Sequence, residues 1–255
     1  MARQLITPPT REPLSLAETK AHLRIDSTDE DNLIRSLIFA SRRYCEGFLN
    51  RALLTQTWDL WLDAFPGEDH IDLPLPPLQS VTHIKYYDTD GTEATMDSGD
   101  YIVDAVTEPG RIVLGYGESW PSTTLRPAKG VVIRFVAGYA AYSGTVNTSG
   151  TAVTKTAGSD FNAAWIPDKN IVINGMVYSL ASVASTSGLT LNATAGTQTG
   201  VAYQTNDVPE NIIQAMKLLI GHWHESREAV LTGSISKEIE FAVKALLWLD
   251  RLWIA

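Results

Sequence analysis

The sequence is poor in cysteine and in charged residues. Its single cysteine, Cys45, excludes an internal disulfide, a redox pair of cysteines and a zinc site built from several cysteines. Charged residues make up only 19% of the 255 positions, and 29 acidic against 20 basic residues leave a formal net charge of −9. This balance disfavours a DNA-reading surface, because phosphate contacts need clustered lysine and arginine.

Long hydrophobic runs are also missing. No stretch reaches the ~18 apolar residues of a membrane-spanning helix, and no run of signal-peptide length follows the first residues. We therefore expect no contact with a membrane, and a protein that is made in the cytoplasm and stays there unless it travels inside an assembly. With 44% hydrophobic residues, a chain of this length can bury a core without metals or disulfides.

Residues 1–53 have the patterns of helices. Ser15 and Glu18 have the spacing of a capping box, and so do Ser27 and Glu30, which predicts helices over 16–23 and 30–49. The longer helix has one apolar face, made of residues at three- and four-residue steps: Leu33, Leu37, Ser41, Tyr44 and Phe48, with Ile34, Ile38 and Cys45 beside them. We expect Cys45 to be a small buried apolar group there.

Between Leu54 and Tyr139 the hydrophobic period changes to two, which is typical of strands. Asp90-Gly91 and Glu108-Pro109-Gly110 have the composition of turns. These signals predict a small antiparallel sheet with long loops, with strands over 54–62, 81–87, 101–106, 111–114 and 131–136.

The composition changes again between Tyr142 and Thr205. These 64 residues hold four charged residues and 25 serine, threonine or glycine residues. Strand-sized apolar blocks surround Asn174-Gly175, which is a hairpin signal, so we expect four to six short strands rather than disorder. Helical patterns resume after Asp207, which makes this segment an insertion.

The predicted fold class is therefore α+β. A helical domain with a central antiparallel β region comprises 1–141 and 206–255, and an inserted all-β module comprises 142–205. The helical part should hold about four helices in a bundle. The stripe of the last helix consists of residues at steps of three and four: Ile235, Ile239, Ala242, Leu246, Leu249 and Trp253, widened by Val243 and Leu247.

Signs of catalytic or cofactor chemistry are weak. His222, His224, Glu225 and Glu228 lack the spacing of a metal site, and the bland interpretation is a polar helix end. Gly115-Tyr116-Gly117 begins like a dinucleotide fingerprint, but its third glycine is missing. The paired aspartates Asp88/Asp90 and Asp97/Asp100 have the positions of turn caps. We predict no catalytic residue, no cofactor and no metal.

The chain end is unusually apolar. Residues 246–255 are apolar nearly all round, although chain ends commonly carry polar residues. An all-round apolar helix is buried, and two interpretations remain open: packing into the protein's own core, or docking onto another chain.

Several segments together resemble the head–tail connector proteins of tailed bacteriophages, also called adaptor or head-completion proteins. The resemblance spans about 1–140 and 207–255, and the insertion departs from the compact members of the family. The matching segments are Pro13–Ile25, Asp29–Arg35, Ala40–Arg51, Leu73–Val81, Val136–Tyr139 and Val208–Ala215.

The resemblance implies a structural role in the virion. Such adaptors form a ring, usually of twelve copies, under the portal protein at the head–tail interface, and the next neck or tail-completion protein follows. DNA passes through the ring without sequence-specific contact, and an acidic lumen would suit this passage. The candidate portal-contact residues lie at the chain end: Leu246, Leu247, Trp248, Leu252, Trp253 and Ile254.

Two other functions stay open at this stage. Trp58, Trp61, Trp120 and the serine- and threonine-rich insertion would suit a carbohydrate- or receptor-binding module, and His222 with His224 would suit a metal hydrolase. The particle itself also stays open, because a phage, a prophage remnant and a gene-transfer particle would use the same component.

Overall fold

The computed structural model describes residues 2–226 and 235–253, with the backbone alone over 235–240. Packing divides the chain into two compact units. The sheet unit comprises 1–11, 46–139 and 248–255, and the helix–barrel unit comprises 12–45 and 140–247. The barrel thus groups with the helices, whereas the sequence-based division set 142–205 apart from all other elements. Each unit is described separately.

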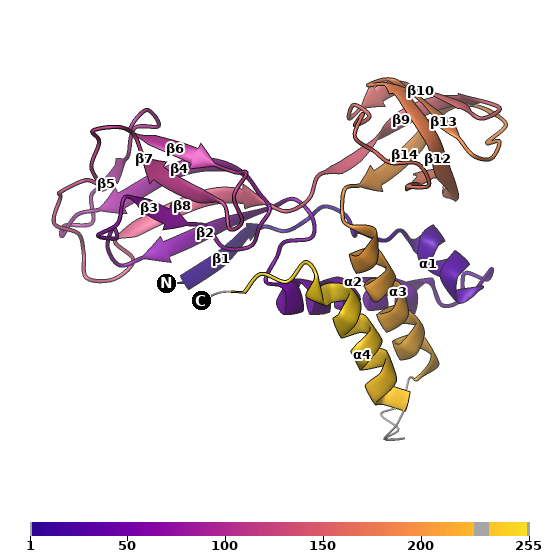
Figure 1. The fold of residues 1–255 in the computed structure, drawn as a ribbon, viewed down its shortest axis with the longest axis horizontal. Helices are drawn as coiled ribbons and strands as arrows, with labels where there is room; N and C mark the ends of the chain where they lie inside the picture. Colours follow the sequence, from indigo (N-terminus) through magenta and orange to yellow (C-terminus); the bar gives the residue numbers. More distant parts are fainter. Residues whose placement is uncertain (1, 227–234, 254–255) are drawn as a thin grey trace. The chain divides into compact units, whose positions relative to one another are not determined.

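Two antiparallel sheets form the sheet unit (Figure 1). The five-stranded sheet has the order β1 (Ala2–Thr7), β2 (Gln56–Leu62), β8 (Val131–Ala137), β4 (Leu78–Tyr87) and β5 (Glu93–Thr95). The three-stranded sheet has the order β3 (His70–Asp72), β7 (Arg111–Leu114) and β6 (Tyr101–Asp104). One core cluster joins both sheets, because Leu60, Ile84 and Ile133 pack with Ile112 of the smaller sheet.

Five strands of the sheet unit were predicted, namely β2, β4, β6, β7 and β8. β3 and β5 were not, because three residues are too few to show a period. β1 corrects the prediction that residues 1–53 are helical throughout. All six of its residues are exposed, so no buried face marks it as a strand, and its pairing with β2 is the tertiary feature that defines it.

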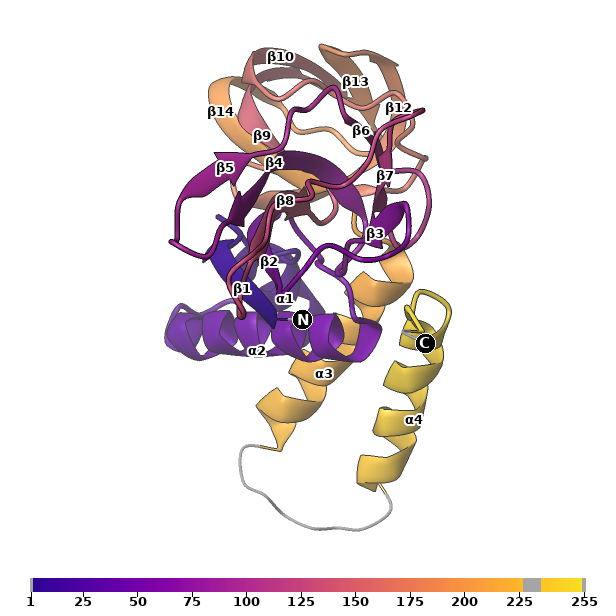
Figure 2. The ribbon, with the colours of Figure 1, turned by 90° about the vertical axis from the view of Figure 1, so that its left-hand side faces the viewer.

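The helix–barrel unit contains α1 (Leu16–Leu23), most of α2 (Asp31–Leu49), α3 (Glu210–Glu225) and α4 (Ile235–Trp248) except its last residue. The capping box predicted for α1 is formed: Glu18 N donates to Ser15 Oγ at 3.1 Å, and Ser15 N donates to the Glu18 carboxylate at 3.0 Å. Figure 2 shows α3 and α4 running side by side, and Asn211 Nδ2 of α3 donates to the carbonyl of Leu246 at 2.8 Å.

α2 buries a face that is rotated from the predicted one. Cys45 is fully buried, as expected. The buried positions are Ile34, Ile38, Ser41, Arg42, Cys45 and Leu49, whereas Tyr44 is 37% exposed. Arg42 lies inside because its guanidinium pairs with Glu12 at 2.6 Å, which satisfies the buried charge. An ion pair that is distant in sequence thus accounts for the burial of Arg42, while Ile34, Ile38, Ser41 and Cys45 are buried as the pattern predicted.

Six antiparallel strands close the inserted barrel, which confirms the all-β module. The order around it is β10 (Ala152–Gly158), β13 (Gly188–Leu191), β12 (Met176–Ser185), β11 (Asn170–Ile173), β14 (Thr197–Asn206) and β9 (Ala141–Ser149). The predicted turn at Asn174-Gly175 joins β11 to β12, and both residues have positive φ, 49° and 78°. This conformation is the one that an Asn-Gly hairpin adopts readily.

Asp207 ties the barrel strands together where the chain leaves the barrel. Its carboxylate accepts hydrogen bonds from the Tyr142 hydroxyl at 2.6 Å and from Trp165 Nε1 at 2.7 Å. Burial and this hydrogen bond to Asp207 raise the pKa of Tyr142 to about 12. The first strand, the core tryptophan and the exit of the barrel therefore share one carboxylate.

Candidate partner-binding surface

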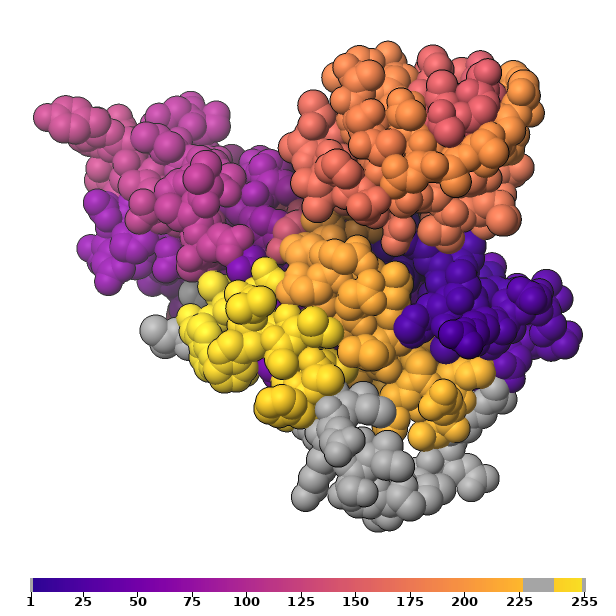
Figure 3. All heavy atoms as spheres, turned by 45° about the vertical axis from the view of Figure 1, so that its right-hand side comes forward, coloured from indigo at the N-terminus to yellow at the C-terminus, as the bar shows by residue number. Residues whose placement is uncertain are grey.

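The end of the chain exposes large apolar side chains. Trp248 is 55% exposed, Leu249 83% and Trp253 60%. Figure 3 shows this last segment, in yellow, on the molecular surface. Single exposed apolar residues are common, but three within six residues are typical of a contact surface. We call Trp248, Leu249, Arg251 and Trp253 the C-terminal knob.

Edge-to-face and cation–π contacts around Arg251 hold the knob in one conformation. The rings of Trp248 and Trp253 meet edge to face, with centroids 4.9 Å apart. The Arg251 guanidinium lies 4.5 Å from the ring centroid of Trp253 and 4.8 Å from that of Phe48. Such cation–π contacts orient the two indoles before any partner arrives. A pre-organised surface loses less conformational entropy on binding.

Hydrogen bonds to backbone atoms anchor the knob to the end of α2. Leu252 N donates to the Leu49 carbonyl at 3.0 Å, and Asn50 Nδ2 donates to the Leu252 carbonyl at 3.3 Å. Arg51 adds a third contact, because its Nε donates to the Asp250 carbonyl. Residues 250–252 are therefore held against the end of α2.

Arg51 is itself held by a carboxylate from the loop before β7. Its side chain is 8% exposed, and its Nη1 lies 2.9 Å from Glu108 Oε1 in a bidentate pair. Burial would lower the pKa of Arg51, but the hydrogen bond and the nearby charge of Glu108 outweigh burial and raise it. The same hydrogen bond lowers the pKa of Glu108. Both groups are therefore charged near neutral pH.

The structure separates the residues that the sequence placed together at the chain end. Trp248 and Trp253 are exposed, Leu246 and Leu252 are half-buried, and Leu247 is fully buried. Ile254 lies outside the described residues. The two interpretations of the chain end therefore apply to different residues. Leu247 packs into the protein's own core, whereas Trp248 and Trp253 are exposed and free to contact another chain.

Sequence reasoning missed the exposure of Leu249 and of Phe241, and it missed the ring contacts of Arg251. Leu249 was assigned to the stripe of α4, yet over 241–248, where side chains are described, the buried positions are Val243 and Leu247. Phe241 is 76% exposed. Two apolar stripes compete on this helix, and periodicity alone does not decide which of them packs against α3.

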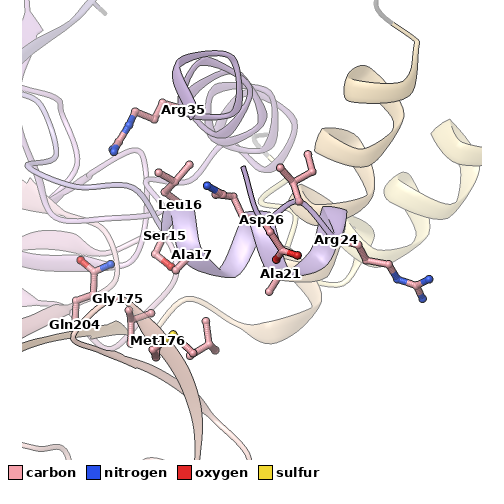
Figure 4. Close-up of a pocket in the computed structure, with 14 residues that line it drawn as sticks. Ser15, Leu16, Ala17, Ala21, Arg24, Asp26, Arg35, Gly175, Met176 and Gln204 are labelled. Carbon is pink, nitrogen blue, oxygen red and sulfur yellow. The ribbon is translucent and has the colours of Figure 1, made fainter. Parts of the chain in front are cut away.

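A pocket of about 740 Å³ lies within the helix–barrel unit, between α1 and the barrel (Figure 4). Leu16, Ala17 and Ala21 of α1 face Met176 of the barrel, and Arg35 of α2 lies at its rim. The lining contains no histidine, and Asp26 is its only carboxylate. Lys20, which also lines the pocket, is paired with Asp31 at 2.8 Å.

The residues that suggested other chemistry have structural contacts. His224 Nε2 lies 2.8 Å from Glu30 Oε2, and no group of three metal-ligating side chains gathers within the part of the chain that the structure describes. Glu228 lies outside that part. Asp88 and Asp97 accept backbone hydrogen bonds within their own turns, as their positions predicted. Gly115-Tyr116-Gly117 precedes no helix.

Two of the tryptophans that suggested sugar binding, Trp61 and Trp120, stack on other rings of the protein. Trp61 lies on Tyr87 with ring centroids 6.5 Å apart. Trp165 is 7% exposed and belongs to the barrel core. Trp120 stacks on Phe65 with ring centroids 5.3 Å apart, and its Nε1 donates to the Glu68 carbonyl at 2.7 Å. Sugar binding uses the open face of an aromatic ring. Trp61 and Trp120 each have one face covered by another ring, and Trp165 is buried.

A protein family model matches part of the chain. Residues 13–109 match the model of the phage gp6-like head–tail connector protein family. The resemblance drawn from the sequence is confirmed over these residues. No curated protein sequence matches the chain.

Solved structures similar to this chain come from gene transfer agent particles. They include a chain of the neck of an empty particle computed with sixfold symmetry (TM-score 0.62, 20% identity) and one of a native virion (0.61, 19%). A third is from the neck of a native particle computed with twelvefold symmetry (0.58, 19%). Each match covers 100% of this chain and 97% of the other. The fold, including the inserted barrel, is thus shared over the whole length.

None of the described helices is long and apolar enough to cross a membrane.

Proposed function

We propose that this protein is a head–tail connector of a phage or phage-like particle, located in the neck of the virion. The observation that carries the proposal is the match of residues 13–109 to the head–tail connector family, joined to a full-length fold that neck proteins share. The role is structural rather than catalytic. The protein joins head to tail and forms part of the conduit through which DNA passes without sequence-specific contact.

The assembly is a ring of this chain under the portal protein. The neck reconstruction with twelvefold symmetry supports twelve copies. A ring needs a head-to-tail contact between copies that closes on itself. The net charge of −9 supports a lumen that repels DNA phosphates and lets the molecule slide. The next neck or tail-completion protein binds the face of the ring away from the portal.

The C-terminal knob is the portal contact in this proposal. Trp248 and Trp253 are exposed, pre-oriented and rigidly anchored, which is the profile of residues that dominate binding energies. Leu246 and Leu252 support them from half-buried positions, and Ile254 continues the same apolar segment. Leu247 contributes by packing α4, because its side chain is buried in the subunit.

Deletion of the gene in its phage or prophage genome tests the role. Electron microscopy of the lysate should show separate heads and tails, with heads that lose packaged DNA. A plasmid copy of the natural gene should restore joined particles. Intact particles that fail to adsorb to cells would contradict the connector role and would favour the receptor-binding alternative.

A further inference from the structure

Two edge strands of the sheet unit are open in the single chain. β1 is the edge of the five-stranded sheet, and all six of its residues are exposed, with Leu5 and Ile6 each 37% accessible. β6 is an edge of the three-stranded sheet, where Ile102 is 61% and Val103 36% exposed. Consecutive residues point to opposite faces of a strand, so both edges expose apolar side chains on both faces.

The other two edges carry the features that prevent unwanted pairing. β5 and β3 are only three residues long. Glu93 of β5 is tied to Lys85 at 2.6 Å and to the Tyr87 hydroxyl at 2.8 Å. Asp72 ends β3, and the exposed Glu68 and Asp69 precede it. Short, charged edges are a usual protection against strand addition. β1 lacks this protection, with six residues and no acidic one, whereas β6 has it only in part, because it has four residues and exposes Ile102 and Val103.

Charge distinguishes the two open edges. β1 carries Arg3, for which no ion pair occurs among the described residues, and it carries no acidic residue. Acidic residues lie near β6 instead. Asp104 and Glu108 are paired with Arg111 and Arg51 of the same unit, whereas no ion pair occurs among the described residues for Asp97 or Asp100 in the loop before β6. A free row of backbone donors and acceptors is best satisfied by another strand, and opposite charges favour pairing of unlike edges over pairing of like edges.

We propose that β1 of one copy pairs with β6 of the next copy. This inference rests on the proposed ring and names the contact that builds it. Because the two edges differ, the contact is head-to-tail, which is the type that can close into a ring. Leu5 and Ile6 then cover Ile102 and Val103, and the ring gains a sheet that continues from subunit to subunit.

Engineered cysteines test the pairing within assembled particles. The single natural cysteine, Cys45, is buried, so added thiols report alone. Four double variants combine Leu5→Cys or Ile6→Cys with Ile102→Cys or Val103→Cys, each supplied to cells that lack the natural gene. Purified particles are treated with a short bis-maleimide, whose reach covers neighbouring registers, and are analysed on denaturing gels.

We expect a ladder of covalent multimers in at least one of the four variants. The matched control joins Leu5→Cys with Thr95→Cys, which places the second thiol on the protected edge β5 and should yield monomers. Tailed particles that give only monomers in all four variants, or a ladder in the control alone, would overturn the pairing and leave the connector role intact. Tailed particles in the deletion strain itself would instead contradict the connector role.

A charge on the open edge provides a second measurement. Ile102→Lys places a cation where Leu5 and Ile6 of the next copy would pack, at a side chain that is already exposed, so folding should be unaffected. We expect at least a tenfold loss of joined particles, whereas Met176→Lys, at a 62% exposed side chain of the barrel, should assemble normally. Equal yields from both variants, with equal thermal unfolding, would contradict the proposed edge contact.

Discussion

Arg51 is the residue on which the position of the chain end depends most. It is 7% exposed, and it joins the Glu108 carboxylate to the Asp250 carbonyl. Removal of a buried cation leaves both acceptors without their donor, and such losses are larger than the energy of a surface ion pair. No feature of the sequence around Arg51 marks this role, because its partners lie 57 and 199 residues away.

We predict that Arg51→Ala lowers the free energy of unfolding by about 2–3 kcal/mol. Arg111→Ala is the matched control, because Arg111 makes a comparable pair with Asp104 at 3.1 Å while its side chain is 42% exposed. The control should lose less than about 1 kcal/mol. Denaturant unfolding followed by tryptophan fluorescence measures both, and equal losses would contradict the assigned role of Arg51.

The Arg51–Glu108 pair also predicts a dependence on pH. Arg51 lowers the pKa of Glu108 in the folded state below its ordinary value of 4.5. The stability from this pair is therefore present above the ordinary pKa and is lost as the pH falls through the lowered folded value. Glu108→Gln should flatten this part of the stability profile. An unchanged acid-side slope in denaturant titrations of the variant would exclude Glu108 as the cause.

At the scale of elements, α4 ends in residues with two different tasks. Leu247 is buried and the tryptophans that flank the final turn are exposed. We predict that Trp248→Ala combined with Trp253→Ala changes the free energy of unfolding by only about 1 kcal/mol. Loss of two anchors should nevertheless weaken attachment to heads by roughly a thousandfold where the two losses add, because each contributes about 2 kcal/mol at a typical interface.

Leu247→Ala is the complementary variant. A buried leucine truncated to alanine costs about 2–5 kcal/mol of folding stability, and the exposed tryptophans remain. Calorimetry and co-sedimentation with tail-less heads separate the two effects. A double tryptophan variant that is as unstable as Leu247→Ala, or that attaches to heads normally, would contradict the assignment of the knob to binding.

The elements that could be predicted have local signals. The Ser15–Glu18 box predicted α1 with both boundaries, and Asn174-Gly175 predicted the β11–β12 hairpin. β1 could not be predicted, because a strand with no buried face has no period of two. The burial of Arg42 in α2 could not be predicted either, since it depends on the pairing of Arg42 with Glu12.

At the scale of the whole molecule, the barrel is an insertion whose two ends meet. Ala141 of β9 is the register partner of Asn206 of β14. We predict that replacing 142–205 by a short Gly-Ser link leaves the sheet unit folded, with its calorimetric midpoint shifted by less than about 4 °C. Collapse of both units into one broad, lowered transition would show that the barrel is essential to the whole chain.

Part of the candidate surface could be predicted from the sequence. An apolar chain end with two tryptophans indicated a contact surface, and the exposures of Trp248 and Trp253 agree with it. The exposure of Leu249 could not be predicted, because α4 has two competing apolar stripes. The position of Arg251 could not be predicted either, because it depends on Phe48, about 200 residues earlier.

A reconstruction of the neck from particles that contain this protein tests the central claim most directly. The account predicts a closed ring of this chain between portal and tail, with the C-terminal knob against the portal. Particles in which the chain is absent from the neck, or lies at the distal end of the tail, would contradict it.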